Sequence, residues 1–134
     1  MMIWVVVAIG SAVGGVARYG VGLLVARAVG AAFPWGTLLI NVLGSFVIGL
    51  FGALTIADGP LPASATARAF VMVGICGGFT TFSSFSLQTV DLLQAGETAP
   101  AAFYVAASVA LCLAGTFLGY WLASRVGVPA RAVQ

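Results

Sequence analysis

The chain contains no lysine and no histidine, and its 134 residues include just five arginines and three acidic side chains. A soluble domain carries about 25% charged residues, whereas this chain carries 6% and is 62% hydrophobic. Its mean hydropathy is +1.18. A water-facing surface cannot be built from this composition, so the chain is predicted to be an integral membrane protein that lies in a lipid bilayer.

The same absences argue against several classes of chemistry. Without histidine there is no imidazole base and no usual zinc site, and without lysine there is no G-x-x-x-x-G-K phosphate loop. Cys76 and Cys112 form no C-x-x-C pair and lie in apolar stretches, which indicates reduced, buried thiols. A net charge of +2 is too small and too scattered for nucleic acid. We therefore expect no enzyme, and a pathway for something small is favoured.

Turn-forming residues divide the chain into four apolar stretches, each long enough to cross a bilayer, which takes about 20 residues. The breaks lie at Gly30–Pro34, Ala57–Ala67 and Gln94–Ala99. The runs lack the period-2 alternation of membrane strands. The sequence predicts an all-α membrane protein with one domain over 1–134, whose spans cover about 3–29, 35–56, 69–93 and 100–124.

The arginines leave the orientation in the membrane weakly determined. Four spans put both termini on one side of the membrane, together with Arg68, Arg125 and Arg131. The other side carries Arg27 and, depending on its depth, Arg18. Such a small bias is typical of insertion in both orientations, and equally of a protein with few charges and one fixed topology. A bundle this small has little interior, so transport would require assembly. Pairs of small residues permit close packing: Gly10–Gly14, Ser11–Gly15, Ser45–Gly49, Gly74–Gly78 and Gly115–Gly119.

Polar side chains recur every four residues in two spans and therefore share a helical face. Asn41 is central in the second span and offers an amide donor, although membrane asparagines also commonly join helices. The fourth span carries a stripe of weak donors: Tyr104, Ser108, Cys112, Thr116, Tyr120 and Ser124. Hydroxyls of this kind can instead bond back to their own helix.

The third span carries the least common pattern, Gly77-Gly78 followed by alternating phenylalanine and hydroxyl residues. Paired glycines weaken a helix, so this helix is predicted to be broken in mid-membrane, with a simple kink as the alternative. Carbonyls exposed from Gly77 to Thr80 suit a cation. Phe82 and Phe85 lie on one face, and their positive ring edges attract an anion unless the rings merely pack. With no basic residue inside the spans except Arg18, the lining suits a small anion.

The chain resembles the Fluc (CrcB) fluoride channels over essentially its whole length. The motifs that carry the resemblance are GGVARY at 14–19, WGTLLINVLGSF at 35–46 and GGFTTFSSFS at 77–86. The resemblance implies an antiparallel, dual-topology homodimer in the bacterial cytoplasmic (inner) membrane, with two pores for passive fluoride export. It also implies a structural sodium ion at the dimer centre, held by the backbone carbonyls of Gly77 and Thr80.

The resemblance also assigns roles to individual side chains. It places Arg18 in a vestibule, and it lines the pore with Asn41, Phe82, Phe85, Tyr104, Ser108, Cys112 and Thr116. Cys112 departs from the family pattern, in which we expect serine, and a thiol is a weaker donor than a hydroxyl. A narrow and rigid lining would exclude the larger chloride ion.

Two other functions stay open. A small dual-topology exporter of drugs or cations needs a carboxylate in its first span, but the three acids, Asp58, Asp91 and Glu97, lie at span ends. A non-transporting assembly subunit needs no aligned polar residues, yet three spans here carry them. Both alternatives therefore fit the sequence less well than an anion channel.

Overall fold

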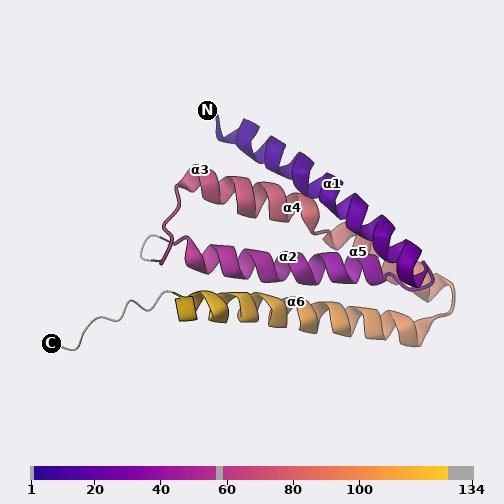
Figure 1. The fold of residues 1–134 in the computed structure, drawn as a ribbon. Helices are drawn as coiled ribbons and strands as arrows, with labels where there is room; N and C mark the ends of the chain where they lie inside the picture. The colour runs from indigo at the N-terminus through magenta and orange to yellow at the C-terminus, as the bar shows by residue number, and fades with distance from the viewer. Residues whose placement is uncertain (1, 57–58, 127–134) are drawn as a thin grey trace.

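The structure is a computed structural model that describes residues 2–56 and 59–126, and this part of the chain is helical (Figure 1). Four helical segments are long and apolar enough to cross a membrane: Ile3–Val29, Trp35–Leu54, Ala65–Gln94 and Thr98–Val126. The prediction of an all-α, multi-pass membrane protein with four such segments is confirmed.

The helices pack as two pairs that lie against each other. Helix α2 (Trp35–Leu54) lies along α6 (Thr98–Val126), and α1 (Ile3–Val29) crosses the first half of the third segment (Figure 1). Helix α1 begins and α6 ends at the same end of the bundle. At the opposite end the chain turns through Gly30 and Gly96, whose φ angles of 85° and 79° are rarely adopted by other residues.

Small residues allow the backbones to touch where the helices cross. A Cβ added at Gly10 would lie 2.6 Å from Phe70 O, and one added at Gly78 would lie 2.5 Å from Ser11 O. A Cβ at Gly49 would meet the Thr116 carbonyl of α6 in the same way. Four of the five small-residue pairs of the sequence therefore lie at helix crossings, where backbone contact takes the place of side-chain packing, whereas a Cβ added at Gly15 of the fifth pair would have no neighbour within 4 Å.

The third segment is assembled from four pieces: α3 (Ala65–Arg68), a π-helix η1 (Ala69–Cys76), α4 (Gly77–Phe79) and α5 (Phe82–Gln94). Between α4 and α5 the backbone is extended at Thr80 (φ −78°, ψ 159°) and at Thr81 (φ −155°, ψ 110°). The helix is therefore interrupted at Thr80, two residues after the paired glycines. π-Helical turns are rare and often occur at functional sites.

The C-terminal end of α2 is closed by an arginine from the next segment. Arg68 Nη1 donates to Gly52 O (3.1 Å) and to Thr55 Oγ1 (2.6 Å), and Thr55 Oγ1 donates to Phe51 O (2.6 Å). A cation at this end satisfies carbonyls that lack helical partners. Helix α3 begins at Ala65, four residues before the expected span start at 69, because Ser64 Oγ accepts the Ala67 N–H (3.2 Å).

Candidate functional site

Asn41 holds the interruption in the third segment. Its Nδ2 donates to Thr81 O (3.1 Å), and its Oδ1 accepts the Thr81 N–H (2.8 Å). In a continuous helix that N–H would bond to Gly77 O. The next turn starts from Thr81, because its Oγ1 accepts the Ser84 N–H (3.1 Å) and so caps α5. The Asn41 amide of α2 thus supplies hydrogen-bond partners for both backbone polar groups of Thr81.

A cavity of about 430 Å³ lies beside the interruption, between α2, the third segment and α6. It is lined by most of the residues that the sequence singled out, namely Asn41, Gly77, Thr80, Phe82, Phe85, Ser108 and Cys112. Every residue that lines it is uncharged. The cavity therefore offers amide, hydroxyl, thiol and aromatic groups to whatever enters it.

Ser108 is the clearest polar group without a structural role in this cavity. Its side chain is buried, and its Oγ has no hydrogen-bond partner among the residues that the structure describes. Leaving a buried hydroxyl unpaired costs about 1–3 kcal/mol. A group bound in the cavity could provide the missing partner.

The phenylalanines form one end of an aromatic row. The Phe82 and Phe85 ring centroids lie 5.3 Å apart, and Phe85 lies 5.1 Å from the Tyr104 ring. Phe85 is partly buried, whereas Phe82 is 78% exposed on the surface of the single chain. The cavity wall at Phe82 therefore faces outward, away from the rest of the bundle.

Tyr104 and Thr116 lie apart from this cavity. Tyr104 is fully buried, and its hydroxyl donates to Gln88 Oε1 (2.9 Å). Thr116 Oγ1 donates to Ser45 O and to Cys112 O, both at 3.1 Å, and so links α6 to α2. In the single chain these two hydroxyls bond to protein groups and do not line the cavity.

Arg18 lies in a second cavity, of about 410 Å³, which contains Thr81, Ser84 and Gln88. Its Nη1 lies 3.5 Å from Thr80 O, at the interruption itself. Thr81 lines both this cavity and the first one. Gln88 did not emerge from the sequence, although its four-residue step from Ser84 places it on the same face of α5.

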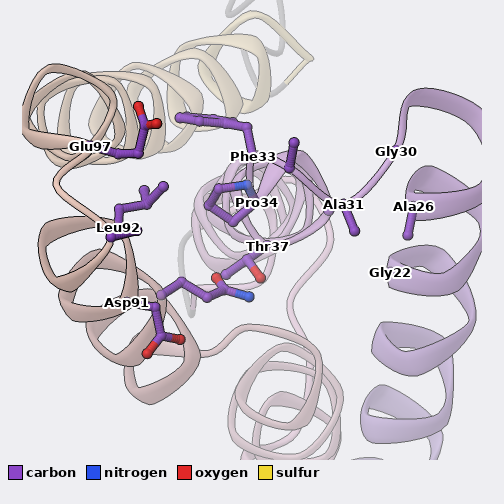
Figure 2. A pocket seen from close by; sticks show the side chains of 14 residues that line it. Gly22, Ala26, Gly30, Ala31, Phe33, Pro34, Thr37, Asp91, Leu92 and Glu97 are labelled. Carbon is purple, nitrogen blue, oxygen red and sulfur yellow. The ribbon is translucent and has the colours of Figure 1, made fainter.

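A third cavity, of about 420 Å³, lies at the end of the bundle (Figure 2). Asp91 and Glu97 lie on its α5 side and Gly22 and Ala26 of α1 opposite, with Thr37 of α2 between them. It shares Gly22, Thr37 and Gln88 with the Arg18 cavity, so the two adjoin. The described residues contain no cluster of three or more His, Cys, Asp or Glu side chains.

Comparison with known proteins identifies relatives over most of the chain. Residues 5–120 match the family described as "CrcB-like protein, Camphor Resistance (CrcB)". A Methylocella silvestris protein named "Fluoride-specific ion channel FluC" is 54% identical over 92% of this chain and 93% of its own. Proteins of the same name from Paramagnetospirillum magneticum (52%; 94% and 98% covered) and Opitutus terrae (49%; 90% and 91% covered) are similarly close. The chain belongs to the CrcB family.

Proposed function

We propose that this protein is a fluoride-selective ion channel, through which fluoride that entered the cell as neutral HF and ionised there leaves down its gradient. The observation that carries this proposal is the uncharged cavity at the interruption, with the unpaired Ser108 hydroxyl and two phenylalanine rings. The names of the relatives support the choice of fluoride.

The lining suits rapid passage of an anion that holds water tightly. Fluoride gives up its water only where comparable interactions replace it, and the Ser108 hydroxyl and the ring edges of Phe82 and Phe85 supply several. Conduction also requires that each site release its ion, and neutral donors bind an anion less firmly than lysine or arginine would. Chloride is larger and gains less from a narrow lining.

The channel works as an antiparallel pair of chains that insert in both orientations in the bacterial inner membrane. This proposal is supported by the exposure of Phe82 at the edge of the cavity, which a second copy would cover, and by the small arginine bias. Lysines added within residues 59–67 would force one orientation and impair flux. Cross-linking that captures parallel pairs alone would contradict the arrangement.

A structural sodium ion belongs between the two chains, at interruptions that lie in mid-membrane. The residues fit such an ion, because the Thr81 N–H bonds to Asn41 and leaves Gly77 O outside the helical ladder. Thr80 O lies at the same interruption, 3.5 Å from Arg18 Nη1. Carbonyls of Gly77 and Thr80 from both chains, related by a two-fold axis, would hold the ion and neutralise the carbonyl dipoles there.

Sodium can be tested separately from conduction. Replacing sodium by a large organic cation should lower the thermal stability of the purified dimer, and adding sodium back should restore it. Equal melting temperatures in both solutions would contradict the proposed ion site.

Fluoride conduction is tested by ion efflux from liposomes that contain the purified protein. Fluoride should leave down its gradient while chloride is retained, and protein-free liposomes provide the control. Comparable rates for the two anions would contradict the proposal. Proton-coupled uptake of an organic cation without fluoride flux would favour the exporter alternative.

A further inference from the structure

Gln88 occupies the junction of two cavities. It lines both the cavity at the end of the bundle, which contains Asp91 and Glu97, and the cavity that contains Arg18. An anion that moved from the bundle end toward the interruption would pass from the two carboxylates to the guanidinium. Gln88 is the amide side chain shared by the acidic cavity and the Arg18 cavity.

The orientation of the Gln88 amide is determined by Tyr104. The Tyr104 hydroxyl carries one proton and donates it to Gln88 Oε1 (2.9 Å). Tyr104 itself is fully buried and is held between the rings of Phe33 (5.4 Å, edge to face) and Phe85 (5.1 Å). The phenol is therefore a fixed donor, and the amide oxygen is the atom directed at it.

This arrangement leaves the amide nitrogen for the cavities. A glutamine has one accepting oxygen and two N–H donors on Nε2. With the oxygen engaged by Tyr104, both donors are available to the space that Gln88 lines. A neutral amide held in this way can bind an anion and release it, because it carries no formal charge.

We propose that Gln88 is a fluoride-binding donor at the junction of these two cavities, and that Tyr104 is a positioning residue that acts through Gln88. The inference rests on the proposed fluoride conduction and adds a site to it. It also gives Tyr104 a role other than direct contact with the ion.

The first test compares fluoride efflux from two glutamine variants on the same helix. Gln88→Met keeps the length of the side chain and removes both donors, so flux should fall about tenfold, the loss expected for one hydrogen bond to a charged group. Half-maximal flux should also require a higher fluoride concentration. The matched control is Gln94→Met at the exposed end of α5, which lines none of the three cavities and should conduct like the parent.

A double variant separates positioning from direct binding. Tyr104→Phe should lower flux in the parent, because the amide loses its fixed orientation, and should add no further loss to Gln88→Met. Parental flux in Gln88→Met, or independent losses from the two substitutions, would overturn the proposal.

Nuclear magnetic resonance provides a test that requires no variant to conduct. The chain has three glutamines, at 88, 94 and 134, so ¹⁵N-glutamine labelling yields a short list of side-chain amide signals. Titration of the unmodified protein with sodium fluoride should shift the Gln88 signal saturably and leave Gln94 in place, and sodium chloride should shift neither. An unmoved Gln88 signal in protein that conducts fluoride would overturn this inference alone, whereas absence of fluoride flux in the parent would overturn the proposed function.

Discussion

Asn41 and Thr81 are joined by two hydrogen bonds that run in opposite directions, amide to carbonyl (3.1 Å) and N–H to amide oxygen (2.8 Å). One side chain of α2 thereby satisfies both backbone polar groups of a residue outside any helix. Unsatisfied backbone groups are costly in a bilayer. The interruption is therefore stabilised by a residue 40 positions earlier in the chain, and the same contact shapes the cavity beside it.

Asn41→Leu is expected to destabilise the protein and to abolish fluoride flux. Leucine resembles asparagine in size but leaves the Thr81 N–H and carbonyl unpaired, which should lower the free energy of unfolding by about 2–4 kcal/mol. Thermal unfolding in detergent and liposome efflux measure the two effects. The control is Ser45→Ala, one turn along α2 at the same cavity, which should unfold like the parent. If Asn41→Leu were as stable as the parent, the two hydrogen bonds to Thr81 would not stabilise the fold.

Ser108→Ala should separate stability from conduction. The Ser108 hydroxyl has no partner in the described chain, so its removal should leave the unfolding free energy unchanged or raise it by up to about 1 kcal/mol. Flux should nevertheless fall about tenfold, because a donor to the ion is lost. Ser124→Ala, whose hydroxyl bonds to its own helix at Trp121 O, should alter neither quantity. A large loss of stability with full flux would mean that Ser108 is a packing residue.

Phe82→Ile and Phe85→Ile should each reduce fluoride flux sharply while the proposed dimer persists. Isoleucine keeps the apolar bulk but lacks the positive ring edge. Phe117, which is 73% exposed and lines none of the three cavities, supplies the matched control. Phe117→Ile should conduct like the parent, with all three variants compared at equal dimer content by size-exclusion chromatography. Normal conduction in both cavity variants would mean that the two rings only pack against their neighbours and do not contact the ion.

Cys112→Ser should conduct at least as well as the parent, and Cys112→Val should conduct less. Serine places a stronger donor in the cavity, whereas valine is close to the thiol in size and donates nothing. A small thiol reagent should reach the half-buried Cys112 and block flux. Cys112→Ser should resist it, because Cys76 lines the same cavity but is only 3% exposed. Unchanged flux in the valine variant, with no block by the reagent, would place Cys112 outside the ion path.

Composition was sufficient to predict the helices, because a chain with so little charge can bury its backbone polar groups in lipid in few other ways. The ends of the helices were less accurate. Helix α2 ends at Leu54 and not at 56, because Arg68 and Thr55 close it. That contact joins two segments across a loop, and no local pattern in the second span contains it.

The four-residue spacing along α6 places Ser108 and Cys112, one turn apart, at the cavity, but Tyr104 and Thr116, one step to either side, do not line it. Ser108 and Cys112 line the cavity, but each four-residue step drifts by about 40°, and by Thr116 the hydroxyl contacts α2 instead. Gln88 was missed because a lone glutamine near the end of a span looks like an ordinary interfacial residue. Its contact with Tyr104 depends on how α5 meets α6, which the spacing within either helix does not reveal.

The π-helix Ala69–Cys76 comes directly before the residues of the third segment that line the cavity. The positions of those residues therefore depend on the length of this helix as well as on its side chains. Each residue inserted or deleted in a helix rotates everything beyond it by about 100°. A residue inserted into η1 would turn the paired glycines away from α1, where Gly78 packs against Ser11, and a residue deleted from it would replace the wide π turn by an ordinary helical turn. Descendants of this chain should therefore accept side-chain changes in η1 far more readily than a change in its length, and gaps in alignments of the family should avoid this segment.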